Sequence, residues 1–247
     1  MFRMSEENES KGNQATSSPL FWFIVPLIVA GALMAFMHTA VGRVYVIPSA
    51  SMEPTLHGCL GCTNDRVYAE KVSYWGDGDP EQNDVVVFET PESWQMQQAP
   101  ERGRAESLAH GILGAIGIVP PDTNFYVKRV IATEGQTVQC LPGDPGVMVD
   151  GKPADEPFGE SNIAPPPGVE ESETCRGPYF GPVTVPEGRL WVMGDNRTNS
   201  LDSRFHQDDH QGTIDKNSVV GKVAAIVGPP SRWTTDVSVS YTHLRAH

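Results

Sequence analysis

The run FYVKRVIAT at residues 125–133 decides which fold we expect. It is rich in β-branched and aromatic residues, which are typical of strands. Side chains alternate between the two faces of a strand, so Tyr126, Lys128, Val130 and Ala132 are expected to share one face. Arg129 then lies on the opposite face. The run therefore predicts a strand that carries a lysine among apolar neighbours.

Short runs of the same kind recur along the chain between turns rich in Gly and Pro. They lie at residues 43–47, 65–72, 83–89, 188–194 and 218–228. Two longer stretches, about 90–124 and 141–187, interrupt this pattern and are interpreted as insertions. The pattern predicts a mainly β domain over residues 43–230 rather than a helical bundle.

The composition is that of a folded, acidic protein. The 247 residues include 18 Lys and Arg against 31 Asp and Glu, which gives a formal net charge of −13. A nucleic-acid-binding surface would need a stripe of basic residues. We therefore expect no nucleic-acid partner.

Residues 20–41 form an apolar run without Lys, Arg, Asp or Glu. As a helix the run would be about 30 Å long, enough to cross the hydrocarbon core of a bilayer. A cleavable signal peptide is the alternative, but its apolar region usually has about 7–15 residues behind a basic start, whereas this leader is acidic. We expect a cytoplasmic tail over 1–19 and a transmembrane helix over 20–42. Two basic residues precede the run and one follows it, which favours an extracytoplasmic domain.

The four cysteines fit an oxidising compartment, because an even number usually indicates disulfides there. Their order in the chain suggests that Cys59 pairs with Cys62 and Cys140 with Cys175. A four-cysteine zinc site is the alternative, since CLGC supplies one zinc knuckle. The second pair, however, is 35 positions apart instead of two to four. We therefore expect two disulfides and no metal.

The stretch IPSASMEPT at 47–55 carries two serines just after the apolar run. Pro48 and Pro54 keep the residues before them out of the helical conformation. We therefore expect Ser49 and Ser51 on extended backbone, with both side chains on the same side. One hydroxyl could then attack a substrate while the other donates a hydrogen bond.

A serine nucleophile needs a base that takes its proton. The sequence has neither a G-x-S-x-G elbow nor a lysine three positions after either serine. Lys128 is the candidate, because burial among apolar neighbours favours the neutral amine and lowers its pKa. The alternative is an ordinary lysine solvated at a sheet edge.

The stretch MGDNRTNSLDSR at 193–204 alternates acidic and basic side chains. Asp195, Arg197, Asp202 and Arg204 could hold this loop together through paired carboxylate and guanidinium groups. The alternative is a plain surface turn.

Three of these stretches, PSASMEPT, YVKRVIATEGQTV and MGDNRTNSLDSR, resemble in their order the conserved boxes of bacterial type I signal peptidases, with DVVVF as a weaker fourth. The resemblance covers about residues 20–228. The CLGC pair and the long insertions are similar to actinobacterial members. One departure is ATEGQTV, where many members carry a Gly-x-Pro-Gly-Asp turn. The resemblance implies a transmembrane helix followed by a signal-peptidase-like β-barrel catalytic core with an inserted second β subdomain.

The resemblance also implies a serine/lysine dyad. Ser51 matches the family's nucleophile, and Lys128 matches its general base. Ser49 matches the hydroxyl of the oxyanion hole, where it works with the backbone N–H of Ser51.

A supporting loop follows from the same resemblance. Ser200 matches the serine that hydrogen-bonds and orients the lysine, and Asp202 and Arg204 match a structural ion pair. The remaining members of this loop are Gly194, Asp195 and Arg197.

The function implied is a membrane-anchored serine endopeptidase that cleaves N-terminal signal peptides from exported preproteins at the plasma membrane. Its partners would be these preproteins and the lipid bilayer, with no cofactor. An extended substrate with small residues before the cut would bind by adding a strand to an exposed sheet edge. The alternatives are a related Ser/Lys maturation protease with a dedicated substrate and a non-catalytic membrane-tethered β-domain that binds exported segments.

Three further features remain. His57, His206 and His210 are expected to be structural or surface residues, although some relatives use a histidine as the base. The apolar run at 111–119 is either a buried segment or a surface that dips into the membrane. Residues 231–247 are interpreted as a tail that need not be native and that carries no functional residue.

Overall fold

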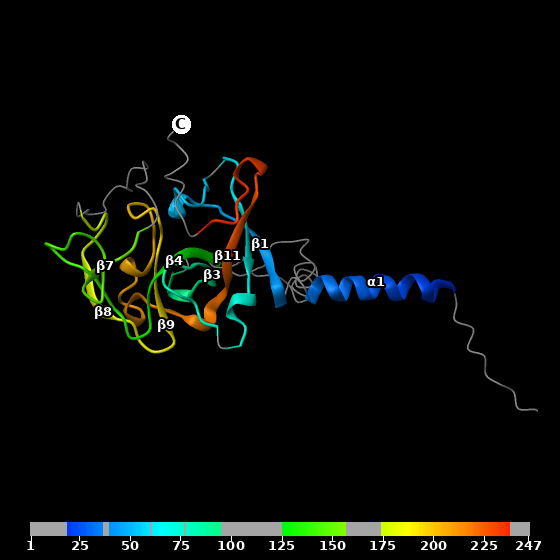
Figure 1. Cartoon of the computed structure of the whole chain (residues 1–247), viewed down its shortest axis with the longest axis horizontal. Coiled ribbons are helices and arrows are strands. Elements are labelled where there is room, and N and C mark those ends of the chain that lie inside the picture. Colours follow the sequence, from blue (N-terminus) through cyan, green and yellow to red (C-terminus); the bar gives the residue numbers. More distant parts are fainter. Residues whose placement is uncertain are drawn as a thin grey trace, which may run out of the picture.

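The computed structural model describes residues 19–36, 40–59, 61–76, 78–94, 125–156 and 174–237. In these residues the chain forms one α-helix, α1 (Pro19–Phe36), two antiparallel β-sheets and several single turns of 3-10 helix (Figure 1). The large sheet consists of β1 (Gly42–Val46), β2 (Arg66–Glu70), β3 (Val85–Glu89), β4 (Phe125–Thr133), β9 (Arg189–Met193), β10 (Ile214–Asp215) and β11 (Val219–Gly228). The small sheet consists of β5 (Thr137–Cys140), β6 (Met148–Val149), β7 (Lys152–Pro153) and β8 (Phe180–Thr184).

The large sheet has the order β1-β2-β11-β3-β4-β9-β10. Each strand predicted from the sequence is present in it, so the mainly β class is confirmed. Among the described strands the sheet is a half-barrel with β1 and β10 at its edges. The last long strand, β11, lies between β2 and β3, which come early in the chain.

The small sheet has the order β7-β6-β5-β8 and follows directly from β4 through a turn at Gly135. Gly135 has φ = +80°, a conformation that glycine adopts without strain. Strands β6 to β8 lie within the predicted insertion at 141–187. Figure 1 shows β7 and β8 on the side of β4 and β9 that faces away from β1.

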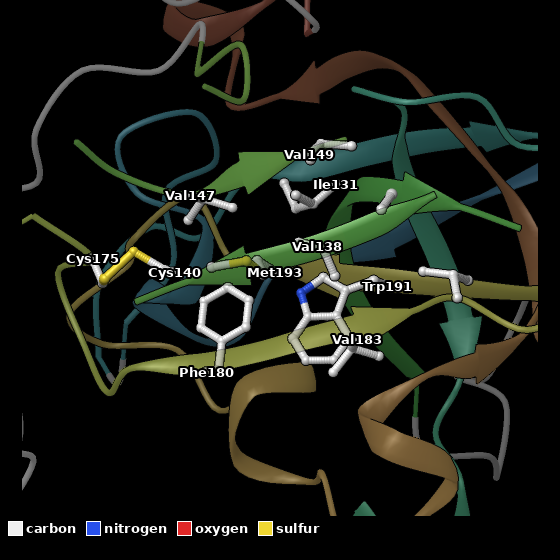
Figure 2. Packing of buried hydrophobic residues seen from close by; sticks show 12 residues of the cluster. Ile131, Val138, Cys140, Val147, Val149, Cys175, Phe180, Val183, Trp191 and Met193 are labelled. Atoms are coloured by element: carbon white, nitrogen blue, oxygen red, sulfur yellow. A yellow bond between two sulfur atoms is a disulfide. The ribbon is translucent and has the colours of Figure 1, made fainter. Parts of the chain in front are cut away.

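The core between the two sheets is built on Trp191, which stacks on Phe180 with ring centroids 5.2 Å apart (Figure 2). The register of β4 against β9 shifts between Val130 and Ala132. This bulge turns Ile131 and Ala132 toward the small sheet, where both are buried. The strict alternation predicted for β4 therefore ends at Val130, and the face predicted for Ala132 is wrong.

The two predicted cysteine pairs lie at disulfide distance. The Sγ atoms of Cys140 and Cys175 are 1.97 Å apart at the edge of the core shown in Figure 2. The Sγ atoms of Cys59 and Cys62 are 2.20 Å apart. Cys140 joins the end of β5 to the segment before β8, so this pair closes the small sheet around its core.

The predicted membrane span at the amino end is not confirmed, whereas the carboxyl end of the described chain is packed onto the domain. In the described segments, no helix combines the length and hydropathy needed to cross a membrane, so the span over 20–42 stays a prediction. At the other end, Thr234 exchanges backbone hydrogen bonds with Ile226, and Val237 is buried. The packed domain thus continues to Val237, beyond the boundary predicted at 230. Residues 1–18, 111–119 and 238–247 lie outside the described residues.

Candidate active site

The serine segment leaves β1 and forms a turn over Ala50–Met52. Ser49 is extended (φ −134°, ψ 158°), as predicted, but Ser51 lies in a turn of 3-10 helix, so the extended backbone predicted for both serines is wrong at Ser51. The cause is tertiary: Asn196 donates its backbone N–H to Ser51 O (3.1 Å) and its side-chain amide to Ala50 O (3.0 Å). The turn brings the Oγ atoms of Ser49 and Ser51 to 3.2 Å.

Two apolar side chains fix this turn to the core. Met52 and Leu56 are 1% and 0% exposed and pack with Tyr45 and Ile47. Leu56 also donates its N–H to Met52 O at 2.9 Å. The backbone of the turn that carries Ser51 is therefore held by the core on one side and by Asn196 on the other.

Lys128 reaches Ser51 from β4, 77 positions later in the chain. Its Nζ donates a hydrogen bond to Ser51 Oγ at 2.7 Å, and the side chain is 4% exposed. Burial lowers the pKa of Lys128 to about 8; Asp202 opposes this shift and Arg204 adds to it. The ring of Tyr126 lies beside the amine, with its centroid 5.6 Å away. Lys128 is thus buried beside an aromatic ring, and roughly a tenth of its amines is neutral at pH 7, far more than for an ordinary lysine.

Gly194 is the point where the serine turn meets the loop after β9. A Cβ placed on Gly194 would lie 2.2 Å from Ser200 Oγ and 2.4 Å from Ser51 O. Both separations are far below contact distance, so only glycine fits here. Its N–H donates to Asp202 Oδ2 at 3.0 Å.

The structure pairs Asp202 with Arg204 in two buried hydrogen bonds, Nε to Oδ1 at 2.8 Å and Nη2 to Oδ2 at 2.9 Å. Both side chains are 0% exposed. Burial alone would raise the pKa of Asp202, but the charge and hydrogen bonds of Arg204 and the N–H of Gly194 hold that pKa below its usual range. The carboxylate is therefore a fixed negative charge near Lys128.

Asp195 and Arg197 are joined by a backbone bond, Arg197 N–H to Asp195 O at 3.0 Å, but contrary to the expectation their side chains pair with residues outside the loop. Asp195 accepts two hydrogen bonds from Arg129, Nε to Oδ1 at 2.8 Å and Nη2 to Oδ2 at 2.6 Å. Arg197 pairs with Glu156, which also binds Arg176. The strand register explains this pairing. Arg129 in β4 lies opposite Met193, the last residue of β9, and Asp195 follows Met193 by two positions.

Ser200 lies in the same loop and is 7% exposed. Its Oγ is buried and has no hydrogen-bond partner among the described residues. The predicted role of Ser200 in orienting Lys128 stays a prediction.

Sequence reasoning missed four residues of the site: Asn196, Thr55, Asp65 and Arg232. Thr55 Oγ1 donates to Asp195 Oδ2 at 2.5 Å, which links the serine segment to the Arg129 pair. Arg232 binds Asp65 through Nε at 2.7 Å and Nη2 at 2.9 Å. It comes from the stretch interpreted as a tail. Thr55 lies within PSASMEPT and Asn196 within MGDNRTNSLDSR, and their place in these two stretches is the sequence feature that could have identified them.

A cleft of about 370 Å³ opens at Ser51. It is lined by residues 45–52, by residues 125–128, and by Asn199 and Leu201. β1 pairs with β2 alone, and residues 125–128 of β4 pair with β3 alone, because the β9 pairing begins at Arg129. In the described part of the chain, two unpaired strand edges thus border the cleft.

The three histidines have different surroundings. His206 stacks on Trp94 with centroids 4.3 Å apart, and burial lowers its pKa. His210 is exposed and pairs with Asp209. His57 pairs with Glu53 and lies close to the first cysteine pair. Of the side chains in the described ranges, only the group of His57, Cys59 and Cys62 could hold a metal ion.

Comparison with known proteins identifies the family of the chain. The family model described as "Signal peptidase, peptidase S26" matches residues 20–228. "Signal peptidase I" of Mycobacterium tuberculosis (strain H37Rv) is 46% identical over 235 residues, which cover 92% of this chain and 78% of that protein. "Probable signal peptidase I" of Mycobacterium leprae (strain TN) is 43% identical over 238 residues, 87% of this chain and 78% of that protein. A crystal structure of a signal peptidase I from Enterococcus faecalis V583 aligns at 20% identity over 58% of this chain and 96% of its own, with a TM-score of 0.33. The chain therefore belongs to the S26 family of signal peptidases and is a serine peptidase.

Proposed function

We propose that the chain is a membrane-anchored endopeptidase that cleaves N-terminal signal peptides from exported preproteins with a dyad of Ser51 and Lys128. The observation that carries the proposal is the hydrogen bond of 2.7 Å between Lys128 Nζ and Ser51 Oγ. The lysine is buried and its pKa is lowered to about 8, so it supplies the neutral amine that a general base needs.

In the first step, neutral Lys128 accepts the proton of Ser51 as Oγ attacks the scissile carbonyl carbon. The tetrahedral intermediate collapses, the protonated lysine gives its proton to the leaving amine, and an acyl-enzyme on Ser51 remains. Lys128 then takes a proton from a water molecule, whose oxygen attacks the acyl carbon; as the C–Oγ bond breaks, Lys128 returns the proton to Ser51 Oγ and the new carboxyl end is released.

Ser49 is assigned to the oxyanion. Its Oγ lies 3.2 Å from Ser51 Oγ, so a hydroxyl donor stands next to the atom that attacks. The backbone N–H of Ser51 is the second donor in this proposal. Preorganised donors of this kind stabilise the negative charge that develops on the carbonyl oxygen.

The substrate is expected to bind as an added strand. The unpaired edges of β1 and of residues 125–128 in β4 border the cleft and offer backbone N–H and C=O groups to an extended peptide. The lining at Ile47, Met52 and Val127 is apolar and suits small side chains before the cut. The enzyme would select a peptide by the length of its extended segment and by the fit of small side chains into shallow pockets, not by a charged side chain of the peptide.

Membrane attachment through residues 20–42 is part of the proposal. It is supported by the uncharged apolar sequence of residues 20–41 and by the acidic leader before it. The anchor would confine enzyme and preprotein to one surface and raise their effective concentration. Membrane attachment can be measured as the fraction of protein that sediments with membranes. The full chain is compared with a shortened chain that begins at Gly42.

The test is cleavage of a purified preprotein that carries a signal peptide. Ser51→Ala and Lys128→Ala should each lower the rate constant by at least a thousandfold, and Ser49→Ala by ten- to a hundredfold. Ser218→Ala and Lys216→Ala are the matched controls, because both side chains are partly exposed and their bonds are to Asp215 O and Asp79, away from the cleft. Undiminished cleavage by Ser51→Ala or Lys128→Ala would refute the dyad.

A further inference from the structure

The loop that follows the serine turn gathers donor atoms that transition metals prefer. His57, Cys59 and Cys62 each offer one ligand atom, and these atoms all lie within 4.8 Å of one another. A zinc ion sits about 2.0–2.3 Å from nitrogen and sulfur ligands, so its ligand atoms are spaced up to roughly 4 Å apart. The loop therefore gathers three donors within reach of one ion, although the two Sγ atoms, 2.20 Å apart here, must separate to roughly 4 Å before both can bind it.

A second observation independently points to a cation. The ring Nδ1 of His57 pairs with the carboxylate of Glu53, whose side chain is 15% exposed. Metal-binding histidines commonly hold one ring nitrogen against a carboxylate, which fixes the ring and leaves the other nitrogen for the ion. A disulfide between Cys59 and Cys62 has no need of an imidazole or a carboxylate.

The backbone of this loop is held in place without any ion. Asp65 donates its N–H to His57 O at 2.8 Å, and Cys59 donates its N–H to Asn64 Oδ1 at 3.0 Å. The carboxylate of Asp65 also accepts the N–H of His57 at 2.7 Å. Hydrogen bonds within the protein thus already order the segment that carries the three donors, so an ion would not have to supply the conformational entropy cost of ordering it.

We infer that His57, Cys59 and Cys62 form a binding site for a divalent ion of the zinc class when the two cysteines are thiols. Two thiolates balance the charge of the ion, neutral His57 supplies the third ligand, and water takes the fourth position. The site is available in one redox state alone, because sulfurs joined in a disulfide cannot bind as thiolates. It is separate from the peptidase chemistry but begins two residues after Ser51, at Glu53.

A thiol reductant can convert the Cys59–Cys62 disulfide into the two thiols in a balanced exchange. Two reductant thiols give two electrons and two protons to the Cys59–Cys62 disulfide, which becomes two thiols, and the reductant leaves as its own disulfide. The ion then displaces the two thiol protons as both sulfurs bind.

The test uses the full chain in detergent and zinc sulfate as the probe. After reduction with a phosphine, which binds zinc weakly, equilibrium dialysis should find one Zn²⁺ per chain, and the oxidised chain should bind none. Replacement by Co²⁺ should give the absorption of a thiolate-to-cobalt charge transfer. Zn²⁺ should also raise the melting temperature of the reduced chain and leave that of the oxidised chain unchanged.

Matched variants identify the ligands. His57→Ala should weaken Zn²⁺ binding at least tenfold, and Glu53→Gln by about ten- to a hundredfold. His210→Ala is the control, because this exposed histidine pairs with Asp209 and lies outside the loop. Cys59→Ser with Cys62→Ser should bind none, although Cys140 and Cys175 remain. The inference fails if the reduced chain binds no more Zn²⁺ than this double variant, or if His57→Ala binds as tightly as the unchanged chain.

Discussion

A buried hydrogen bond of 2.5 Å joins the hydroxyl of Thr55 to a carboxylate oxygen of Asp195, 140 positions later in the chain. The same carboxylate binds Arg129, the neighbour of Lys128 in β4. The segment that carries the nucleophile and the strand that carries the base are therefore tied to one buried charge. This tie accounts for the fixed distance between Ser51 and Lys128.

Replacing Thr55 tests this tie. Thr55→Val keeps the shape of the side chain but leaves an oxygen of Asp195 short of one donor, which should cost about 1–3 kcal/mol in the free energy of unfolding. Because the serine turn loses its link to β4, kcat should fall more than KM rises. Urea unfolding and cleavage kinetics measure both effects. Thr55→Ser retains the hydroxyl and should stay near the unchanged chain; equal losses in both variants would contradict the explanation.

The buried ion pair of Asp195 and Arg129 should contribute more to the free energy of unfolding than an exposed ion pair does. Asp195→Ala leaves Arg129 charged and buried, and breaking such a pair typically costs about 3–5 kcal/mol. Asp79→Ala removes an exposed partner of Lys216 and should leave the free energy of unfolding unchanged within error. Denaturant titration of the two variants side by side gives the comparison, and a similar small loss in both would contradict it.

The activity should depend on pH through Lys128. The base works when neutral, so kcat/KM should rise as pH increases toward about 8 and level off above it. A pH–rate profile measures this limb. A profile that stays flat between pH 6 and roughly 9, with the protein folded throughout, would rule out a lysine base with the lowered pKa.

The same lowered pKa has an effect on stability with a defined sign. The pKa of Lys128 is about 8 in the folded chain, against 10.5 for an ordinary lysine in water, so the unfolded chain binds more protons between these values. This group's contribution to the free energy of unfolding therefore rises with pH across that window, and below pH 8 its burial costs roughly 3 kcal/mol. Lys128→Met should be inactive yet at least as stable as the unchanged chain at pH 7, measured by urea unfolding. A large loss of stability in Lys128→Met would contradict the assignment of desolvation as the main cause.

Gly194 should tolerate no side chain. Gly194→Ala places a methyl group against Ser200 Oγ and Ser51 O, which must push the serine turn away from Lys128. A displacement of about 1 Å at reacting groups can cost a hundredfold in rate, so kcat should fall by about that factor. Gly146→Ala is the control, since its nearest neighbour would be Thr174 O at 3.8 Å. The measurement is the cleavage rate at saturating substrate, and a Gly194→Ala variant with full activity would contradict the close approach.

The long strands could be predicted because their side chains alternate or form dense apolar runs, as in β3 and β4. Strands β6 and β7 could not, since two residues carry no pattern. The turn at Ala50–Met52 was also out of reach, because its carbonyls are held by Asn196 from a distant loop. The same holds for the partner of Asp195, which depends on the register between β4 and β9. Residue types and order predicted the members of the site, whereas their pairing is a property of the folded sheet.

The order of the large sheet also sets the order in which the site can be assembled. The serine turn follows β1 beside β2, the lysine belongs to β4 beside β3, and β11 lies between these two groups of strands. A chain that emerges from its amino end first therefore holds two separate half-sheets until its final long strand arrives. Backbone pairing within the sheet joins the strand before the nucleophile to the strand of the base only through β11, so a chain without β11 has no continuous sheet behind the site.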